Sequence, residues 1–250
     1  MEAARVARLR GHNVTLFEKR KLGGVLNEGS AGEFKADLRF LITNMIHQIK
    51  SAGVRIVMEK AISDRLAGGN FDIVILATGG GSSLPDIPGL TSERVVDAID
   101  IFDKPDQVGK EVVVLGGGET AVEAALYLAD QGRRVTLLHR RDLMAEDCVI
   151  TDKIAYLELL VQKQVTIMLP YQVTAIDGRI LTAAHRQTGE TISLEADHFV
   201  TALGYRPAQT GLAQALCGQT GIDVYEIGDG ARTAKVLDGI HAGFKLARRL

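Results

Sequence analysis

Apolar residues along the chain gather in short continuous runs that alternate with longer, helix-like stretches. The runs Ile73–Ala77 and Val112–Leu115 have the length and β-branched composition of strands that are buried on both faces of a parallel sheet. The Ala- and Leu-rich stretch Val122–Gln131 favours a helix, which Gly132 ends before the next apolar run, Val135–Leu138. This strand–helix–strand order predicts βαβ units and therefore an α/β fold.

The pattern repeats along the chain. Met1–Arg20 aligns without a gap with Val122–Arg141, and further downstream Asp72–Gly79 resembles Asp197–Gly204. The residues of the first segment that meet identical partners are Glu2, Ala3, Ala4, Gly11, Val14, Thr15, Leu16 and Arg20. Two copies of one supersecondary plan are therefore expected in tandem.

A glycine-rich turn stands at the start of the second copy. The strand Glu111–Leu115 is followed by the sequence Gly-Gly-Gly-Glu-Thr-Ala, which spells G-x-G-x-x-A from Gly116 to Ala121. Gly116 makes the tight turn, Gly118 lets the backbone approach a pyrophosphate, and Ala121 lets the helix pack closely on the strand. Because the motif follows a strand and opens a helix, it predicts a dinucleotide site on the free N–H groups of that helix.

The corresponding turn of the first copy is absent from the sequence. Met1 aligns with Val122, the residue after Ala121, so the first strand and its glycine turn are expected before Met1. The chain is expected to be a fragment, or the product of an internal start, that binds FAD poorly. Glu18 remains at the end of the strand Val14–Phe17, where a carboxylate can accept both hydroxyl protons of an adenosine ribose.

The strand ends of the two copies differ in charge. Glu18 suits an unphosphorylated ribose, whereas its counterpart His139 is followed by Arg140 and Arg141. Two guanidinium groups beside a ribose favour a 2′-phosphate through charge-assisted pairing, and hence NADPH. The alternative is a solvated basic strand end, of the kind that Lys19 and Arg20 form in the first copy.

Two further turns carry local signals. Asp177-Gly178, between apolar runs, predicts a β-hairpin. Near the end of the chain, Gly228-Asp229 follows a short strand and precedes a helix that begins at about Lys235. This turn leaves room for a bulky ligand, offers a carboxylate to a hydroxyl, and places a helix N-terminus near bound negative charge.

Composition excludes several classes of protein. The 250 residues contain 29 Lys and Arg against 31 Asp and Glu, and this balance argues against a nucleic-acid or membrane-surface binder. No apolar run is long enough to span a bilayer, and the first residues have no apolar signal core. Cys148 and Cys217 form neither a CxxC pair nor a disulfide framework, so we expect a cytoplasmic protein.

Five blocks of sequence resemble the flavoproteins with two dinucleotide-binding domains. More narrowly, they resemble the C-terminal FAD/NAD(P) half of the 2-enoate reductase, 2,4-dienoyl-CoA reductase and trimethylamine dehydrogenase group, also called the NADH:flavin oxidoreductase group. The blocks are FEKRKLGG (Phe17–Gly24), ILATGGGSSLPDIPG (Ile75–Gly89), VLGGGETAVEAALYL (Val114–Leu128), TALGYRP (Thr201–Pro207) and YEIGDGARTAKVLDGIHAGF (Tyr225–Phe244).

The resemblance implies an α/β fold of two Rossmann-like dinucleotide-binding domains, one inserted in the other. The FAD domain is expected over residues 1–90 and 208–250, and the NAD(P) domain over residues 91–207. Residues implied in FAD binding are Glu18, Arg20, Gly23, Gly24, Ala77, Thr78, Gly79, Gly228 and Asp229. Residues implied in NADP(H) or NAD(H) binding are Gly116, Gly118, Glu119, Thr120, His139, Arg140, Arg141 and Gly204.

The implied activity is hydride transfer from NAD(P)H to flavin in an enoate-reductase-type enzyme. The cofactors supply that chemistry, so no side chain is nominated as catalytic, and no metal site is expected. A partner domain, an FMN barrel with an iron–sulfur cluster, is expected upstream. Two alternatives stay open: a non-catalytic domain that holds ADP or NAD(P), and a freestanding ferredoxin- or thioredoxin-reductase-like flavoprotein. His139, Arg140 and Arg141 also resemble the basic motif of thioredoxin reductases, but Ala145 stands where that family has a further basic residue. The sequence also has no CxxC motif, so disulfide reduction is disfavoured.

Overall fold

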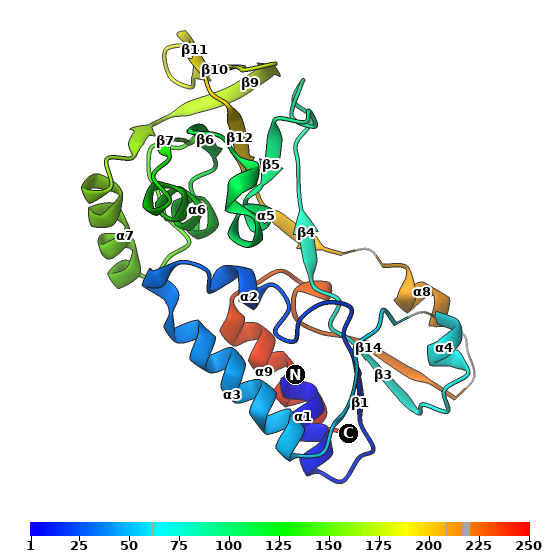
Figure 1. The fold of residues 1–250 in the computed structure, drawn as a ribbon. Coiled ribbons are helices and arrows are strands. Elements are labelled where there is room, and N and C mark those ends of the chain that lie inside the picture. Colours follow the sequence, from blue (N-terminus) through cyan, green and yellow to red (C-terminus); the bar gives the residue numbers. More distant parts are fainter. Residues whose placement is uncertain (62, 209, 217–220) are drawn as a thin grey trace. The chain divides into compact units, whose positions relative to one another are not determined.

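The computed structural model describes residues 1–61, 63–208, 210–216 and 221–250. They fall into two compact units (Figure 1). Unit 1 comprises Met1–Ser30, Lys35–Gly81 and Tyr205–Leu250, and unit 2 comprises Ala31–Phe34 and Ser82–Gly204. The chain leaves unit 1 in β4 (Gly80–Ser82), returns in β13 (Tyr205–Pro207), and these two strands pair.

Unit 2 is built on one five-stranded parallel sheet with β6 at its centre. Neighbours of β6 are β12 and β7, and its side chains are buried on both faces. This environment explains the continuous apolar run in the sequence. In spatial order the strands are β5 (Val95–Asp97), β12 (His198–Thr201), β6 (Glu111–Leu115), β7 (Arg134–Leu138) and β8 (Thr166–Met168).

Helices cover one face of this sheet. The core on that face joins Val112 and Val114 of β6 to the small and aliphatic side chains of α6 (Glu119–Asp130). The same cluster includes residues of α5 (Ala98–Asp103) and α7 (Ile150–Gln162). Because Ala121, Ala124 and Ala125 are fully buried, α6 lies close against the strands.

The other face of the sheet meets a second, antiparallel sheet. Val113 and Leu115 of β6 pack there with residues of β9 (Tyr171–Asp177) and β10 (Ile180–His185). β10 pairs with β9 and with β11 (Thr191–Glu195), and Gly178 makes the β9–β10 turn with a φ of 56°. The predicted hairpin is therefore confirmed.

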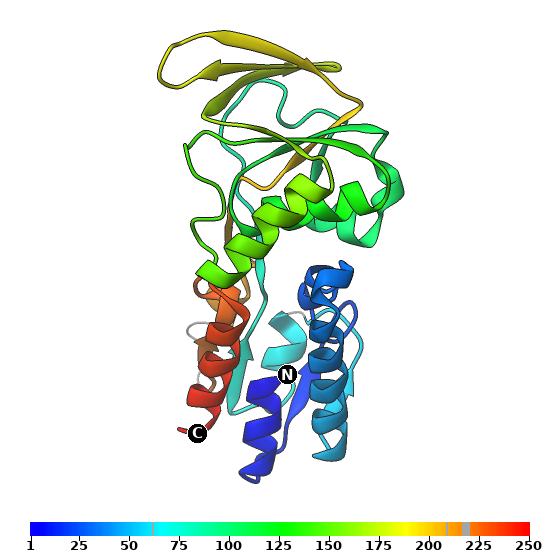
Figure 2. The same cartoon turned by 90° about the vertical axis from the view of Figure 1, so that its left-hand side faces the viewer.

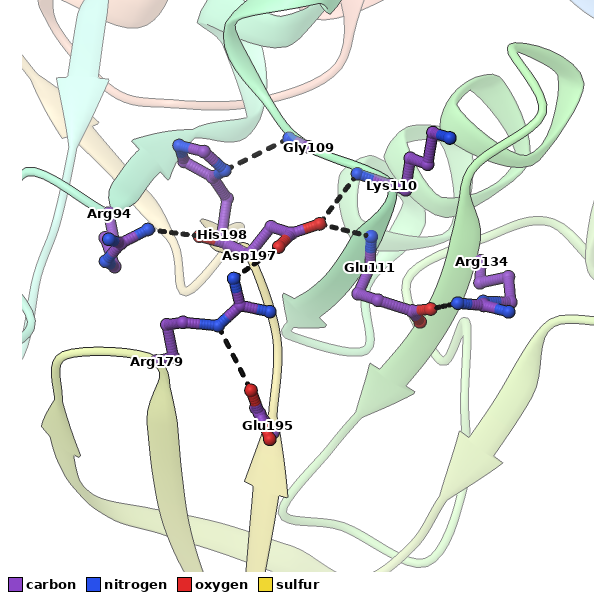
Figure 3. A network of polar contacts seen from close by, with 9 residues as sticks. All are labelled: Arg94, Gly109, Lys110, Glu111, Arg134, Arg179, Glu195, Asp197 and His198. Atoms are coloured by element: carbon purple, nitrogen blue, oxygen red, sulfur yellow. Dashed lines mark hydrogen bonds and ion pairs between the residues drawn. The ribbon is translucent and has the colours of Figure 1, made fainter.

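A polar network fastens the amino ends of the central strands (Figure 3). The carboxylate of Asp197 accepts the backbone N–H groups of Lys110 at 2.9 Å and Glu111 at 3.0 Å, and it pairs with Arg179 at 2.9 Å. A Cβ on Gly109 would lie 2.4 Å from the Cβ of Asp197, so only glycine fits there. Lying at the amino end of β6, the network is separate from the glycine turn at its carboxyl end.

Unit 1 has smaller sheets and three longer helices. β1 (Thr15–Phe17) pairs in parallel with β2 (Arg55–Val57), and β3 (Ile73–Leu76) pairs in parallel with β14 (Asp223–Glu226). α1 (Glu2–Leu9) packs against both α3 (Asp37–Ser51) and α9 (Val236–Ala247), as Figure 2 shows. Short helices complete the described chain: α2 (Leu26–Gly29), α4 (Ser63–Ala67), α8 (Leu212–Leu216) and 3-10 turns at Glu33–Lys35, Pro105–Gln107 and Gly228–Gly230.

The predicted α/β class is confirmed, with small shifts at element ends. α6 begins at Glu119, inside the glycine motif, and not at Val122 as the sequence suggested. The N-cap of α9 is Lys235, where the last helix was expected to start. Within the described ranges, no helix combines the length and apolarity that crossing a membrane requires.

Candidate functional site

The turn between β6 and α6 has no room for side chains. Gly116 has a φ of 143°, and a Cβ on it would lie 2.4 Å from the carbonyl oxygen of Ala202. A Cβ on Gly117 would lie 2.2 Å from the His139 ring. Glycines are needed here because the Ala202 carbonyl and the His139 ring occupy the space of a side chain, and they let the strand turn sharply into the helix.

The N-terminus of α6 already engages an anionic group. Gly118 is the N-cap, so it brings no side chain to the first turn. The Glu119 N–H donates to Oδ1 of Asp147 at 2.9 Å, and the Ala145 N–H donates to the Gly117 carbonyl at 2.7 Å. A carboxylate on this helix end marks the position that an anion prefers. Sequence reasoning missed Asp147, because one acidic loop residue belongs to no periodic pattern.

The basic strand end lies beside this turn. His139 follows β7 and its ring packs on Gly117. The backbone N–H of His139 donates to the Met168 carbonyl at 3.1 Å. Burial, followed by the charges of Arg141 and Arg140, lowers the pKa of His139 below its usual 6.5. The imidazole is therefore neutral at pH 7, and the permanent positive charge belongs to the two exposed arginines.

Those arginines line an open cavity of about 430 Å³. Arg141 is paired at 3.2 Å with Glu146 of the same loop. The wall also includes Arg186 of the turn between β10 and β11, a residue that sequence reasoning missed. The cavity is lined by Arg140, Arg141, Asp142, Leu143, Glu146, Pro170, Arg186 and Gln187.

The remaining predicted residues of unit 2 lie at the same edge of the sheet. Thr120 is exposed in the first turn of α6. Gly204 follows β12 with a φ of 134°, and its carbonyl accepts the Ser83 N–H at 2.9 Å. The carbonyl of Ala202, which directly follows β12, thus packs against Gly116.

In unit 1, Glu18 and Arg20 are held within their own loop. Glu18 follows β1, and its Oε1 accepts the Arg20 N–H at 2.8 Å. The guanidinium of Arg20 pairs with Glu28 at 2.6 Å. Within the described part of the chain, the buried Oε2 of Glu28 has no hydrogen-bond partner. Gly23 and Gly24 both have positive φ angles, 110° and 58°, which glycine alone adopts at low cost.

A second group of predicted residues meets where β3 and β14 end. Ala77, Thr78 and Gly79 follow β3, and the Ile227 N–H after β14 donates to the Leu76 carbonyl at 2.9 Å. Gly228 has a φ of 60°, and Asp229 accepts the Ala234 N–H at 3.0 Å. A Cβ on Gly230 would lie 3.1 Å from Oγ1 of Thr78. The structure thus brings the two turns together, although their strands belong to a different sheet from β1.

Of the two cysteines, the structure describes one. Cys148 is half-buried and forms no disulfide within the described ranges, and Cys217 lies outside them. Across the described ranges, no three His, Cys, Asp or Glu side chains gather as metal ligands.

Comparison with known proteins identifies the family. The model of the pyridine nucleotide-disulphide oxidoreductase family matches residues 1–240. The chain belongs to this family. Membership implies FAD and NAD(P)H as cofactors, and the flavoprotein resemblance read from the sequence is confirmed.

Three similar proteins are larger than this chain. An NADH oxidase from Thermoanaerobacter brockii is 32% identical, covering 99% of this chain and 39% of the oxidase. A cinnamate reductase from Clostridium sporogenes is 30% identical, covering 100% of this chain and 37% of the reductase. The solved structure of 2-naphthoyl-CoA reductase matches with a TM-score of 0.93 at 30% identity, covering 100% of this chain and 38% of that one. The chain thus spans about two fifths of their lengths.

Proposed function

We propose that this chain is the nucleotide-binding part of a larger NAD(P)H-dependent flavin oxidoreductase. The observation that carries the proposal is the β6–α6 turn, where closely packed glycines join strand to helix and the helix N-terminus holds the carboxylate of Asp147. Such a turn accepts a dinucleotide pyrophosphate without rearrangement of the strand that carries it. When both cofactors are bound, the nicotinamide supplies a hydride and the flavin accepts it.

Unit 2 is the proposed NAD(P)H domain. Gly116 and Gly118 admit the pyrophosphate, while Glu119 and Thr120 offer first-turn N–H groups. Since Asp147 now accepts the Glu119 N–H, a bound phosphate oxygen shares or replaces that contact. His139, Arg140 and Arg141 lie at the adenosine ribose, where two exposed guanidinium groups select the 2′-phosphate of NADPH. Gly204 borders the site at the end of β12.

Unit 1 is the proposed FAD domain. Glu18, at the end of β1, holds the adenosine ribose, with Arg20, Gly23 and Gly24 on the loop that follows. The turns after β3 and β14 offer Ala77, Thr78, Gly79, Gly228 and Asp229 to the ribityl-phosphate side. The residues fit the cofactor: positive-φ glycines keep these turns free of side chains, and Glu28 presents an unpaired buried oxygen among the described residues.

For the whole enzyme we propose reduction of an enoate-type substrate in the cytoplasm. The support is the similarity over the full chain to a cinnamate reductase and to 2-naphthoyl-CoA reductase. Because the chain spans about two fifths of each, the substrate-binding part is assigned to a further domain, an FMN barrel with an iron–sulfur cluster.

The placement of NADPH is tested with Gly118→Val. Titration calorimetry of the 250-residue chain should give NADPH binding that the variant loses, because a branched side chain blocks the backbone approach. The matched control is Gln131→Val, which puts the same side chain at the exposed far end of α6. Unchanged binding in Gly118→Val contradicts the placement.

The proposed hydride transfer from NADPH to flavin has its own test. The chain is mixed with FAD and NADPH under nitrogen, and flavin absorbance near 450 nm is followed. Bleaching that depends on the protein supports an oxidoreductase. NADPH binding with no bleaching, at FAD concentrations high enough to saturate even a weak site, supports the non-catalytic nucleotide-binding domain instead.

A further inference from the structure

The cavity beside the glycine turn is built from two segments that are far apart in sequence. One wall is the loop after β7, with Arg140, Arg141 and Glu146. The other is the turn between β10 and β11, with Arg186 and Gln187. An arginine from a different element therefore faces the same open space of about 430 Å³ as the basic strand end.

Hydrogen bonds fix the turn that carries Arg186. The Arg186 N–H donates to the Pro170 carbonyl at 2.9 Å. The His185 ring accepts the N–H groups of Gln187 at 3.3 Å and Thr188 at 3.2 Å, and the ring meets Tyr171 edge-on. The backbone at Arg186 is thus set before any ligand arrives, which lowers the entropy lost on binding.

The same turn is tied to the opposite wall. Nε2 of Gln187 donates to Oδ1 of Asp142 at 3.0 Å, and Arg141 pairs with Glu146 at 3.2 Å. These contacts engage both carboxylates of the cavity. Within the described residues, Arg140 and Arg186 have no carboxylate partner. Two unpaired guanidinium groups on facing segments suit an anion with several oxygens, such as a phosphate monoester.

We infer that Arg186 is a specificity-determining residue that binds the 2′-phosphate of NADPH from the hairpin side, opposite Arg140. The inference rests on the proposed function, since it deepens the NAD(P)H site of unit 2. It also explains why an otherwise ordinary exposed turn is held by the ring of His185 and the side chain of Gln187.

The test compares two probes that differ only in the 2′-phosphate: adenosine 2′,5′-bisphosphate and adenosine 5′-monophosphate. Dissociation constants are measured by calorimetry for the full chain, Arg186→Gln and Lys104→Gln. Lys104 is an exposed residue at the C-cap of α5, outside the cavity lining, so its variant matches the change in charge. Arg186→Gln should bind the bisphosphate about tenfold more weakly than the parent and the monophosphate within about twofold of it. Lys104→Gln should bind both probes within about twofold of the parent.

The outcomes separate the inference from the proposal beneath it. A parent that prefers the bisphosphate and an Arg186→Gln variant that keeps the full preference overturn the role of Arg186 alone. Equal weakening of both probes also overturns it. A parent that binds both probes equally contradicts the NADPH preference, and with it the inference. Arg186→Lys, which retains the charge, should fall between parent and Arg186→Gln, and this variant still decides the matter if glutamine impairs folding.

Discussion

The two units carry the same repeated plan and differ in how their strands meet. In unit 2, β6 lies between β12 and β7, and all five parallel strands share one sheet. In unit 1, the sequence counterparts of these neighbours are β3 and β1, which belong to separate two-stranded sheets. Among the described residues of unit 1, no strand joins the two pairs.

The difference shows what a central strand contributes to a dinucleotide site. β6 delivers the glycine turn and precedes α6, whose N-terminus in unit 2 already donates to a carboxylate at the position we propose for a pyrophosphate. In unit 1 the residues proposed for FAD binding lie at strand ends: Glu18 follows β1, and two turns follow β3 and β14. The positions that we propose for the ribose and the ribityl chain therefore lie on two separate strand pairs among the described residues. Four stability measurements and one measurement of cofactor binding test this contrast.

The largest loss of stability is expected from Gly116→Ala in unit 2. The substituted residue would have both a positive φ and a methyl group against the Ala202 carbonyl, so the free energy of unfolding should fall by roughly 4 kcal/mol. Gly204→Ala is the control, because its φ is similar and the space around it is open; roughly 2 kcal/mol is expected there. Urea unfolding measures both. Equal losses would show that the tight packing over Gly116 is unimportant.

Asp197→Ala should cost roughly 2 kcal/mol, because two backbone N–H groups and Arg179 lose their acceptor. Glu195→Ala removes an exposed carboxylate from the same arginine and should cost less than about 0.5 kcal/mol. Urea midpoints of the two variants give the comparison. A loss in Asp197→Ala no larger than in Glu195→Ala would mean that the network in Figure 3 does not fasten the sheet.

In unit 1, Gly230→Ala should cost only about 1 kcal/mol. Its Cβ would lie 3.1 Å from the Thr78 hydroxyl and 3.2 Å from the Thr78 N, contacts that a small shift relieves. Gly239→Ala, in the middle of α9 with open space around it, should instead stabilise by about 0.5–1 kcal/mol. A cost for Gly230→Ala that equals that of Gly116→Ala would remove the contrast in packing between the units.

The smallest effect concerns pH. Burial, followed by the charge of Arg94, lowers the pKa of His198 below 6.5, while Asp197 opposes the shift. Because the folded state binds this proton more weakly than the unfolded state, the stabilisation is present above pH 6.5 and is lost as the pH falls. His198→Gln keeps an acceptor for the Gly109 N–H and should lose less stability than the parent between pH 7.5 and pH 5. The measurement is the urea midpoint of each protein at both pH values. An equal fall in stability for the parent and His198→Gln would refute the role given to His198.

Local sequence patterns predicted the elements that depend on near neighbours. The buried β-branched run of β6, the glycine turn after it and the Asp177-Gly178 hairpin all follow from residues close together in the chain. The start of α6 was placed too late, because a helix that begins within a glycine-rich turn has no apolar spacing in its first residues.

Features that depend on distant segments could not be read from the sequence. Asp147 reaches the α6 N-terminus from a loop, and Arg186 enters the cavity from a hairpin turn. Each is a single polar residue whose role exists only once two segments fold against each other. The separate pairing of β1 with β2 and of β3 with β14 likewise depends on contacts between segments far apart in the chain. The cofactor assignments of the individual site residues stay predictions.

The most direct test measures both cofactors on the same 250-residue chain. After incubation with FAD and desalting, the FAD:protein ratio is read from absorbance, and the desalted protein is then titrated with NADPH by calorimetry. We expect one NADPH per chain at unit 2 and an FAD:protein ratio far below one, because contacts at strand ends, worth about 1 kcal/mol each, do not replace a helix-end anion site. Stoichiometric FAD together with no NADPH binding would contradict this expectation.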